Sequence, residues 1–206
     1  CFFTSHLAET TWRCDAARKN MGVSPVKALK HSGLLNDHYI GSHAVYLDSE
    51  DIRLMAACGA KVVNTPVCEM KIADGLAPVP EMVRAGVVVA LGTDGAMWSN
   101  SNDIFCEMKC MALVHSLHSG ARTFTARDVL DMATINGAKL FGLEQDLGTI
   151  EQGKLADIIL IEAHRPHMTP LRTGEAENVS SNIVYCATGA DVSDVFVGGR
   201  HLVKDH

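Results

Sequence analysis

The sequence has 206 residues, of which 47% are hydrophobic and 20% are charged, and its formal net charge is −6. This composition is typical of a globular protein, and the length suggests one large domain or one and a half. The acidic balance and the lack of a basic run argue against a nucleic-acid partner. No apolar stretch reaches the ~18 residues of a membrane span, so we expect no membrane partner.

The seven cysteines form no C-x-x-C pair. An odd number of scattered cysteines predicts buried, reduced thiols, which favours a cytoplasmic location. No signal peptide is visible. Because the sequence begins at Cys1 rather than at a methionine, we interpret it as a piece of a longer protein.

Strand-like and helix-like segments alternate over the first half of the chain. After a short apolar segment at 1–5, we predict strands at 39–45, 61–64 and 87–91 and helices at 9–21, 25–31, 50–58 and 80–85, with a long loop at 65–79. Ser24 and Ser49 are the expected caps of the second and third helices, and Pro25 occupies the first position of the second. Four successive β-α units predict a parallel sheet with right-handed crossovers.

The apolar run at 87–91 ends on a single aspartate between glycines. Its lack of alternation predicts a strand buried on both faces. Gly92 and Gly95 allow a tight turn that leaves Asp94 at the carboxyl end of this strand. Ligand sites of parallel α/β proteins lie at that end, so Asp94 is a candidate site residue.

The second half of the chain changes character near residues 142–148. A loop at 98–102 is followed by predicted helices at 103–118, 126–132 and 135–141, then a strand at 157–161, an irregular stretch at 164–182 and a hairpin turning at Gly198-Gly199. The glycine pair between two apolar runs favours the hairpin. We therefore predict an α/β part at 1–145 and a β-rich part at 146–206.

Two histidines and a glutamate also follow predicted strands. His6 and Glu9 come after the first apolar segment, and His43 lies at the end of the second strand. Together with Asp94 they would share one rim of the sheet. Imidazole and carboxylate ligands suit zinc or ferrous iron, although a complete set needs residues upstream of Cys1.

Each of these residues also has a structural interpretation. A histidine can be a hydrogen-bonded core residue, Glu9 a helix N-terminal acid and Asp94 a turn carboxylate. Their common position after strands favours a shared site over separate structural roles.

Five segments carry a resemblance to a known family: HLAET, Ser42-His43, NTPVCEMKIADGLAPVP, GTDGAMWSNSNDIFCEMK and DLGTIEQGKLADIILIE. Over essentially its whole length the chain resembles the amidohydrolase superfamily. Within the aminohydrolase and chlorohydrolase branch, it is similar to the S-adenosylhomocysteine/5′-methylthioadenosine deaminases. The resemblance implies the C-terminal half of a (β/α)8 TIM barrel, strands five to eight, plus the C-terminal part of a small β-sandwich.

The resemblance also implies roles for the candidate residues. His6 and Asp94 correspond to metal ligands, Glu9 to the acid that contacts the substrate's ring nitrogen, and His43 to the histidine beside the metal-bound water. Asp94 is also expected to take part in catalysis and substrate binding. Trp98 stands where many family members have a smaller residue, so it should shape the substrate pocket. The first-strand His-x-His pair of the family is absent from this chain.

These roles predict a hydrolytic deaminase of an adenosine-type nucleoside or related N-heterocycle, with one divalent metal, zinc or alternatively iron. The metal would turn a bound water into hydroxide, Asp94 would accept its proton, Glu9 would protonate the ring nitrogen, and ammonia would leave. The same residues could expel chloride or open a cyclic amide. We also expect a homo-oligomer.

A different class of function also remains open. The chain could be a non-catalytic fragment or one subunit of a split protein, with open sheet edges. We expect the isolated chain to be inactive.

Overall fold

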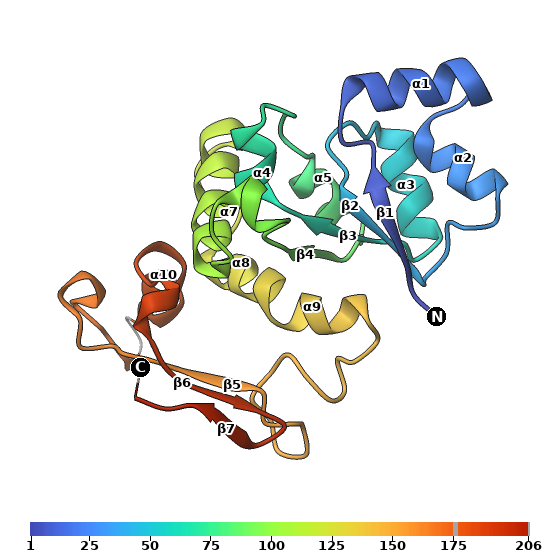
Figure 1. Cartoon of the computed structure of the whole chain (residues 1–206). Coiled ribbons are helices and arrows are strands. Elements are labelled where there is room, and N and C mark those ends of the chain that lie inside the picture. Colours follow the sequence, from blue (N-terminus) through green and yellow to red (C-terminus); the bar gives the residue numbers. More distant parts are fainter. Residues whose placement is uncertain (175–176, 206) are drawn as a thin grey trace. The chain divides into compact units, whose positions relative to one another are not determined.

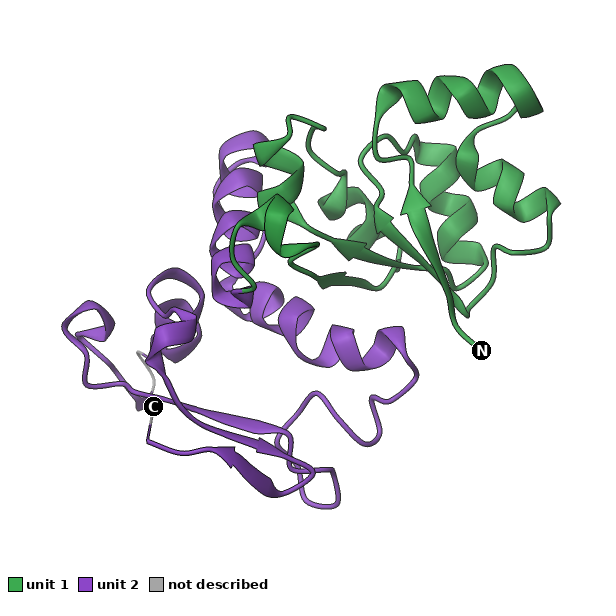
Figure 2. Ribbon diagram, viewed as in Figure 1, with its two compact units in different colours: residues 1–102 green, residues 103–206 purple. Residues whose placement is uncertain are grey.

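The computed structural model describes residues 1–174 and 177–205. The chain forms two compact units, residues 1–102 and 103–206 (Figure 2). All candidate site residues lie in the first unit. The boundary expected at 145/146 would separate barrel residues from a β-rich segment, whereas the boundary at 102/103 separates two compact units. The expected boundary therefore stays a prediction.

The first unit is built on a parallel sheet of four strands in chain order (Figure 1). The strands are β1 (Phe3–Leu7), β2 (Tyr39–His43), β3 (Lys61–Asn64) and β4 (Val89–Leu91). The helices are α1 (Thr11–Met21), α2 (Pro25–His31), α3 (Ser49–Ala57), α4 (Pro66–Lys71), α5 (Val79–Arg84) and α6 (Ala96–Ser99). The predicted parallel sheet of β-α units is therefore confirmed.

Local hydrogen bonds decide where these helices begin. Ser24 Oγ accepts from Lys27 N at 3.2 Å, which confirms the predicted cap of α2. The predicted Ser49 cap was wrong, because the Asp48 carboxylate accepts from two backbone N–H groups at 2.9 and 2.8 Å. A carboxylate in this position also interacts favourably with the helix dipole.

Two segments predicted to be loops contain short helices. α4 lies within 65–79, and α6 covers Ala96–Ser99, where the expected loop begins at 98. Pro66 occupies the first turn of α4, a position that suits proline because its missing N–H would have no helical partner. This proline was the overlooked helix signal.

The core of the first unit lies against its strands. Leu7, Tyr39, Val62 and Val89 are at most 1% exposed. A Cβ atom on Gly41 of β2 would lie 2.7 Å from Leu7 Cδ2, so only glycine allows this side chain to pack over the neighbouring strand. Leu7 therefore anchors the strand that carries His6.

The second unit combines helices with a three-stranded antiparallel sheet of order β5-β6-β7. Its elements are α7 (Ile104–Ser119), α8 (Ala126–Ala133), α9 (Ile135–Leu140), β5 (Ile158–Ile161), α10 (Val179–Tyr185), β6 (Val192–Val197) and β7 (Arg200–Val203). The predicted hairpin at Gly198-Gly199 is confirmed, because β6 pairs with β7. The stretch predicted to be irregular at 164–182 contains the start of α10 and a 3₁₀ turn at Pro166–Met168.

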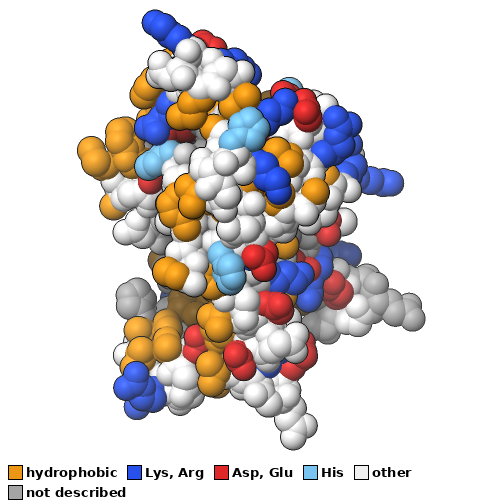
Figure 3. Space-filling view, turned by 90° about the vertical axis from the view of Figure 1, so that its right-hand side faces the viewer, with side chains coloured by type: hydrophobic (Ala, Val, Ile, Leu, Met, Phe, Trp, Pro, Cys, Tyr) orange, Lys and Arg blue, Asp and Glu red, His pale blue; other side chains and the backbone are white. Residues whose placement is uncertain are grey.

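The surface carries hydrophobic side chains among charged side chains of both signs (Figure 3). Trp12 is 64% exposed and Leu117 is 88% exposed. Within the described part of the chain, no helix has the length and apolar character that crossing a membrane requires.

Candidate active site and metal centre

Three candidate side chains converge at the carboxyl ends of β1 and β2. Metal-binding atoms of His6, Glu9 and His43 all lie within 4.8 Å of one another. The two imidazole rings stack with their centroids 5.3 Å apart, and His43 Nε2 is 3.8 Å from Glu9 Oε1. The parallel register pairs Leu7 with His43, which brings these distant parts of the sequence to one edge.

The chain turns sharply where these strands end. Ala8, His43, Ala44 and Asp94 have φ angles of 44°, 72°, 59° and 55°, in the left-handed region that favours glycine. Ala44 N donates to Leu7 O at 3.0 Å and so ties the two turns together. Such residues cost about 1–3 kcal/mol each and cluster at functional sites. The backbone thus supports the location that the side chains indicate.

Glu9 lies just before α1, whose N-cap is Thr10, rather than inside the helix as predicted. It is 9% exposed, and its Oε2 is 3.1 Å from Arg13 Nε. This ion pair offsets part of the cost of burying the carboxylate. The Arg13 guanidinium also lies 5.2 Å from the centroid of the exposed Trp12 ring.

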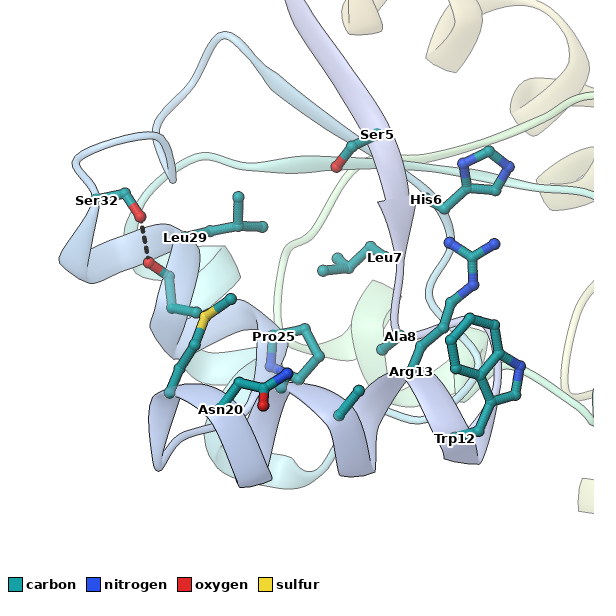
Figure 4. A pocket seen from close by; sticks show the side chains of 14 residues that line it. Ser5, His6, Leu7, Ala8, Trp12, Arg13, Asn20, Pro25, Leu29 and Ser32 are labelled. Carbon is teal, nitrogen blue, oxygen red and sulfur yellow. Dashed lines mark hydrogen bonds between the residues drawn. The ribbon is translucent and has the colours of Figure 1, made fainter.

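Arg13, Trp12 and His6 line a recess of about 430 Å³ beside β1. Figure 4 shows these three side chains on the same side of the strand, with His6 projecting from β1 and the other two from α1. The recess therefore presents a cation, an indole and an imidazole next to the cluster of metal-binding atoms.

His43 is 2% exposed, and its Nδ1 lies 3.0 Å from Thr65 Oγ1 and 3.6 Å from Glu69 Oε1. Burial alone would lower its pKa. The adjacent Glu69 carboxylate and the charges of Glu9 and Asp94 outweigh that effect and raise the pKa of His43 above its ordinary value. His43 is therefore surrounded by carboxylates that favour its protonated form.

Asp94 follows β4 and is exposed, and it stands outside the group of three close metal-binding residues. Its Oδ1 accepts from Gly95 N at 2.7 Å, and its Oδ2 accepts from Cys68 Sγ at 3.0 Å. Burial and the neighbouring Asp94 raise the pKa of the Cys68 thiol to about 12. Cys68 is consequently a neutral donor that orients Asp94, not a thiolate ligand.

Trp98 lies in α6, whose N-cap is Gly95, and so follows closely after Asp94 in the sequence. Its side chain is 42% exposed, and a Cβ atom on Gly95 would lie 3.2 Å from Trp98 Cδ1. Glycine at 95 therefore allows the indole to approach the turn that holds Asp94.

The sequence interpretation missed a buried polar network behind His43. Asn64, Thr65 and Glu69 are at most 3% exposed, and Asn64 and Thr65 both donate hydrogen bonds to the Glu69 carboxylate. Asn64 ends β3, so the rule that selected polar residues at strand ends also selects it. Glu69 lies in α4, where a loop was predicted, and no sequence pattern placed it next to a histidine.

A parallel α/β unit with histidines and carboxylates at its strand ends has the arrangement of a metal-dependent hydrolase. The chain belongs to the amidohydrolase family, whose profile matches residues 2–202.

Named relatives support this membership. The chain is 40% identical over 199 residues to a 5-methylthioadenosine/S-adenosylhomocysteine deaminase of Moorella thermoacetica, covering 96% of this chain and 45% of the relative. A zinc-bound adenosine deaminase from Xanthomonas campestris superposes with a TM-score of 0.92 and 30% identity, covering 98% of this chain and 45% of that one. Zinc-complexed atrazine chlorohydrolase from Arthrobacter aurescens gives a TM-score of 0.89 and 25% identity, covering 99% and 44%. The chain thus spans slightly under half the length of these relatives.

Proposed function

We propose that this chain forms the catalytic part of a metal-dependent deaminase that acts on an adenosine-type nucleoside or a related N-heterocycle. The observation that carries the proposal is the cluster of His6, Glu9 and His43, whose metal-binding atoms lie within 4.8 Å of one another. The deaminase names of relatives at 40% and 30% identity support the same reaction class.

The donor atoms of the site fit a divalent metal. Imidazole nitrogen and carboxylate oxygen are ligands that zinc accepts, and ferrous iron accepts the same set. We propose His6 and Asp94 as the ligands from this chain, with zinc favoured by the zinc-bound relatives. When bound, the ion supplies a Lewis acid and lowers the pKa of a coordinated water.

The remaining side chains handle protons and charge. Glu9 would donate a proton to the ring nitrogen next to the amine-bearing carbon, which makes that carbon electrophilic. His43 Nε2 faces Glu9 across 3.8 Å. In the protonated form that the surrounding carboxylates favour, Nε2 would donate a hydrogen bond to the negative charge that develops at the reacting centre. Asp94 would accept a proton from the attacking water, while Cys68 holds its Oδ2 in place.

Trp98, Glu9 and Asp94 are the proposed substrate contacts within this chain. The half-exposed indole of Trp98 offers an apolar face next to the Asp94 turn, which suits a flat heterocycle. Release of Glu9 from Arg13 would be part of substrate entry, because Glu9 Oε2 is paired with that guanidinium here.

The four parallel strands are proposed as strands five to eight of a (β/α)8 barrel, and residues 146–206 as one share of a β-sandwich. Coverage of about 45% of the relatives supports a half-barrel. The other half would come from residues outside this chain and would bring the remaining metal ligands. A homo-oligomer is proposed for the assembled protein.

Ammonia release by the protein, expressed at the length that its gene encodes, tests this function. Adenosine, 5′-methylthioadenosine and S-adenosylhomocysteine are the substrates to compare. Glu9→Gln should reduce turnover by about 10²–10⁴-fold, the usual contribution of a general acid. Asp15→Asn is a matched control, since Asp15 is a 74% exposed carboxylate on the following helix. Undiminished turnover in Glu9→Gln would rule out the assigned role.

The structural similarity to atrazine chlorohydrolase supports a second candidate, hydrolysis of a chloro-triazine. Glu9 would then protonate a triazine ring nitrogen, and chloride would leave in place of ammonia. Chloride release with a chloro-triazine, and no ammonia from the nucleosides, would select this alternative.

A further inference from the structure

Glu69 is a buried carboxylate with an unusually complete set of donors. It is 1% exposed and lies in the short helix α4. Asn64 Nδ2 donates to both of its oxygens at 2.8 Å, while Thr65 N and Thr65 Oγ1 donate to Oε1 at 3.1 and 3.3 Å. So many hydrogen bonds hold a buried carboxylate in one orientation.

This carboxylate stands directly behind the His43 ring. His43 Nδ1 lies 3.0 Å from Thr65 Oγ1, whose own hydrogen bond goes to Glu69, and 3.6 Å from Glu69 Oε1 itself. With its proton committed to Glu69, the Thr65 hydroxyl can only accept from the ring. The hydrogen on Nδ1 is therefore the one that the network satisfies, and Nε2 is left facing Glu9.

The same network holds the backbone of His43. Asn64 Nδ2 donates to His43 O at 3.3 Å while it binds Glu69. His43 has a φ of 72°, in a region that a non-glycine residue occupies only when its surroundings enforce it. Ring and backbone of one site residue thus depend on a single carboxylate.

We propose that Glu69 is a positioning residue, which fixes the orientation and the Nδ1–H tautomer of His43 through Thr65 so that Nε2 points into the cluster with His6 and Glu9. The kinetic consequence of this inference rests on the proposed deaminase function. The tautomer itself does not, and it can be measured separately. Hydrogen-bond partners behind a site histidine set which ring nitrogen faces the chemistry.

The test uses ¹⁵N NMR of histidine-labelled protein at the length that its gene encodes, with the His43 signal assigned from its loss in His43→Asn. The wild-type protein should show Nδ1 protonated and Nε2 unprotonated at alkaline pH. Glu69→Gln removes the charge and places an amide against the Asn64 donors, so the Nε2–H tautomer should gain. With the nucleoside substrate, kcat should fall by about 10–100-fold while KM changes by less than about threefold.

Asp51→Asn is the matched control. Asp51 is also a buried carboxylate of the first unit, 2% exposed, and it accepts from Ser24 Oγ at 2.6 Å. Its substitution should lower stability without altering the His43 spectrum or the ratio of kcat to KM. An unchanged His43 tautomer together with unchanged kcat in Glu69→Gln would overturn the proposal.

Thr65→Val decides the question if Glu69→Gln does not fold. It removes the hydroxyl that links ring and carboxylate, and the Thr65 side chain makes no capping hydrogen bond to α4. A shift toward the Nε2–H tautomer supports the proposal, and retention of the wild-type tautomer refutes it. If the His43 spectrum changes but no variant or wild-type protein releases ammonia, the proposed function fails while the positioning role stands.

Discussion

The two units use buried polar side chains in different ways. In residues 1–102 one group of them lies at or beside the strand ends and its members contact one another, as Glu69 of α4 does with Asn64 and Thr65 behind His43. In residues 103–206, Asn182 and Asp191 each fasten a local loop: Asn182 Nδ2 donates to Met168 O, and Asp191 accepts from Thr188 and pairs with His167. The meeting of several polar side chains, rather than their burial, distinguishes the proposed site from a residue such as Asn182 or Asp191 that holds a loop in place, which we call a fastener.

The hollows of the two units differ in the same sense. A cavity of about 550 Å³ in the second unit is the larger of the two and is lined mainly by apolar side chains such as Ile104, Met108 and Ile158. The recess of about 430 Å³ in the first unit includes His6 and Arg13. Volume alone would select the cavity of the second unit, whereas the chemistry that we propose requires titratable groups in reach of one another.

The largest expected effect contrasts an aspartate from each unit. Asp94→Asn should reduce kcat/KM for deamination by about 10²–10⁴-fold, which corresponds to roughly 3–5 kcal/mol of transition-state stabilisation. Asp191→Asn should leave kcat/KM within about twofold, since Asp191 closes a loop. Steady-state ammonia release measures both. Equal losses in the two variants would remove the distinction between site and fastener.

Core packing beneath the site should matter next. Leu7 is 1% exposed and packs over Gly41, so Leu7→Ala should lower the free energy of unfolding by about 2–5 kcal/mol. Leu117→Ala, at a position that is 88% exposed, should change it by less than about 0.5 kcal/mol. Urea titration compares the two variants. A small effect at Leu7 would show that β1 is not held by this packing.

The fastener of the second unit should reveal itself through pH. Burial tends to raise the pKa of Asp191, but hydrogen bonds from His167 and Thr188 outweigh it and hold the pKa below its ordinary value of 3.8. A carboxylate whose pKa is lower in the folded state contributes to folding stability at pH values above its unfolded-state pKa. This contribution is lost as the pH falls through the folded-state pKa. The free energy of unfolding of the wild-type protein should therefore exceed that of Asp191→Asn by about 1–2 kcal/mol at neutral pH. This difference should disappear as the pH falls below about 4.

Thermal or urea unfolding from pH 3 to 7 gives this difference. A gap that stays constant across the range would show that the ionised carboxylate does not stabilise the loop.

Helix caps supply the smallest contrast. Thr125 and Asp128 form a reciprocal capping box at α8, whereas Thr10 accepts a single bond of 3.4 Å from Arg13 N at α1. Thr125→Ala should cost about 1 kcal/mol, and Thr10→Ala less than half of that. The free energies of unfolding of the two variants test this order. A larger loss of stability in Thr10→Ala than in Thr125→Ala would contradict it.

Much of the first unit was predictable because its signals are local. Helix α2 and strand β3 have the predicted bounds, since Ser24, Pro25 and a short apolar run mark them directly. The convergence of His6 and His43 followed from the topology, because parallel strands end at the same edge.

Other parts depend on contacts that no local pattern encodes. α4 was expected to be a loop, and this hid the return of Glu69 to His43. The pairing of Cys68 with Asp94 likewise joins α4 to the turn after β4. The tertiary fold decides which side chains meet, so contacts of this kind between different elements can be identified only from the structure.

Metal content tests the central claim most directly. The protein, expressed at the length that its gene encodes and purified without chelators, should bind about one zinc or iron ion per chain, as expected for a mononuclear hydrolytic site. His6→Ala should lose most of this metal, while His167→Ala, the fastener histidine of the second unit, should keep it. Full metal occupancy in His6→Ala, or ammonia release by metal-free protein, would contradict a metal-dependent site at the strand ends of the first unit.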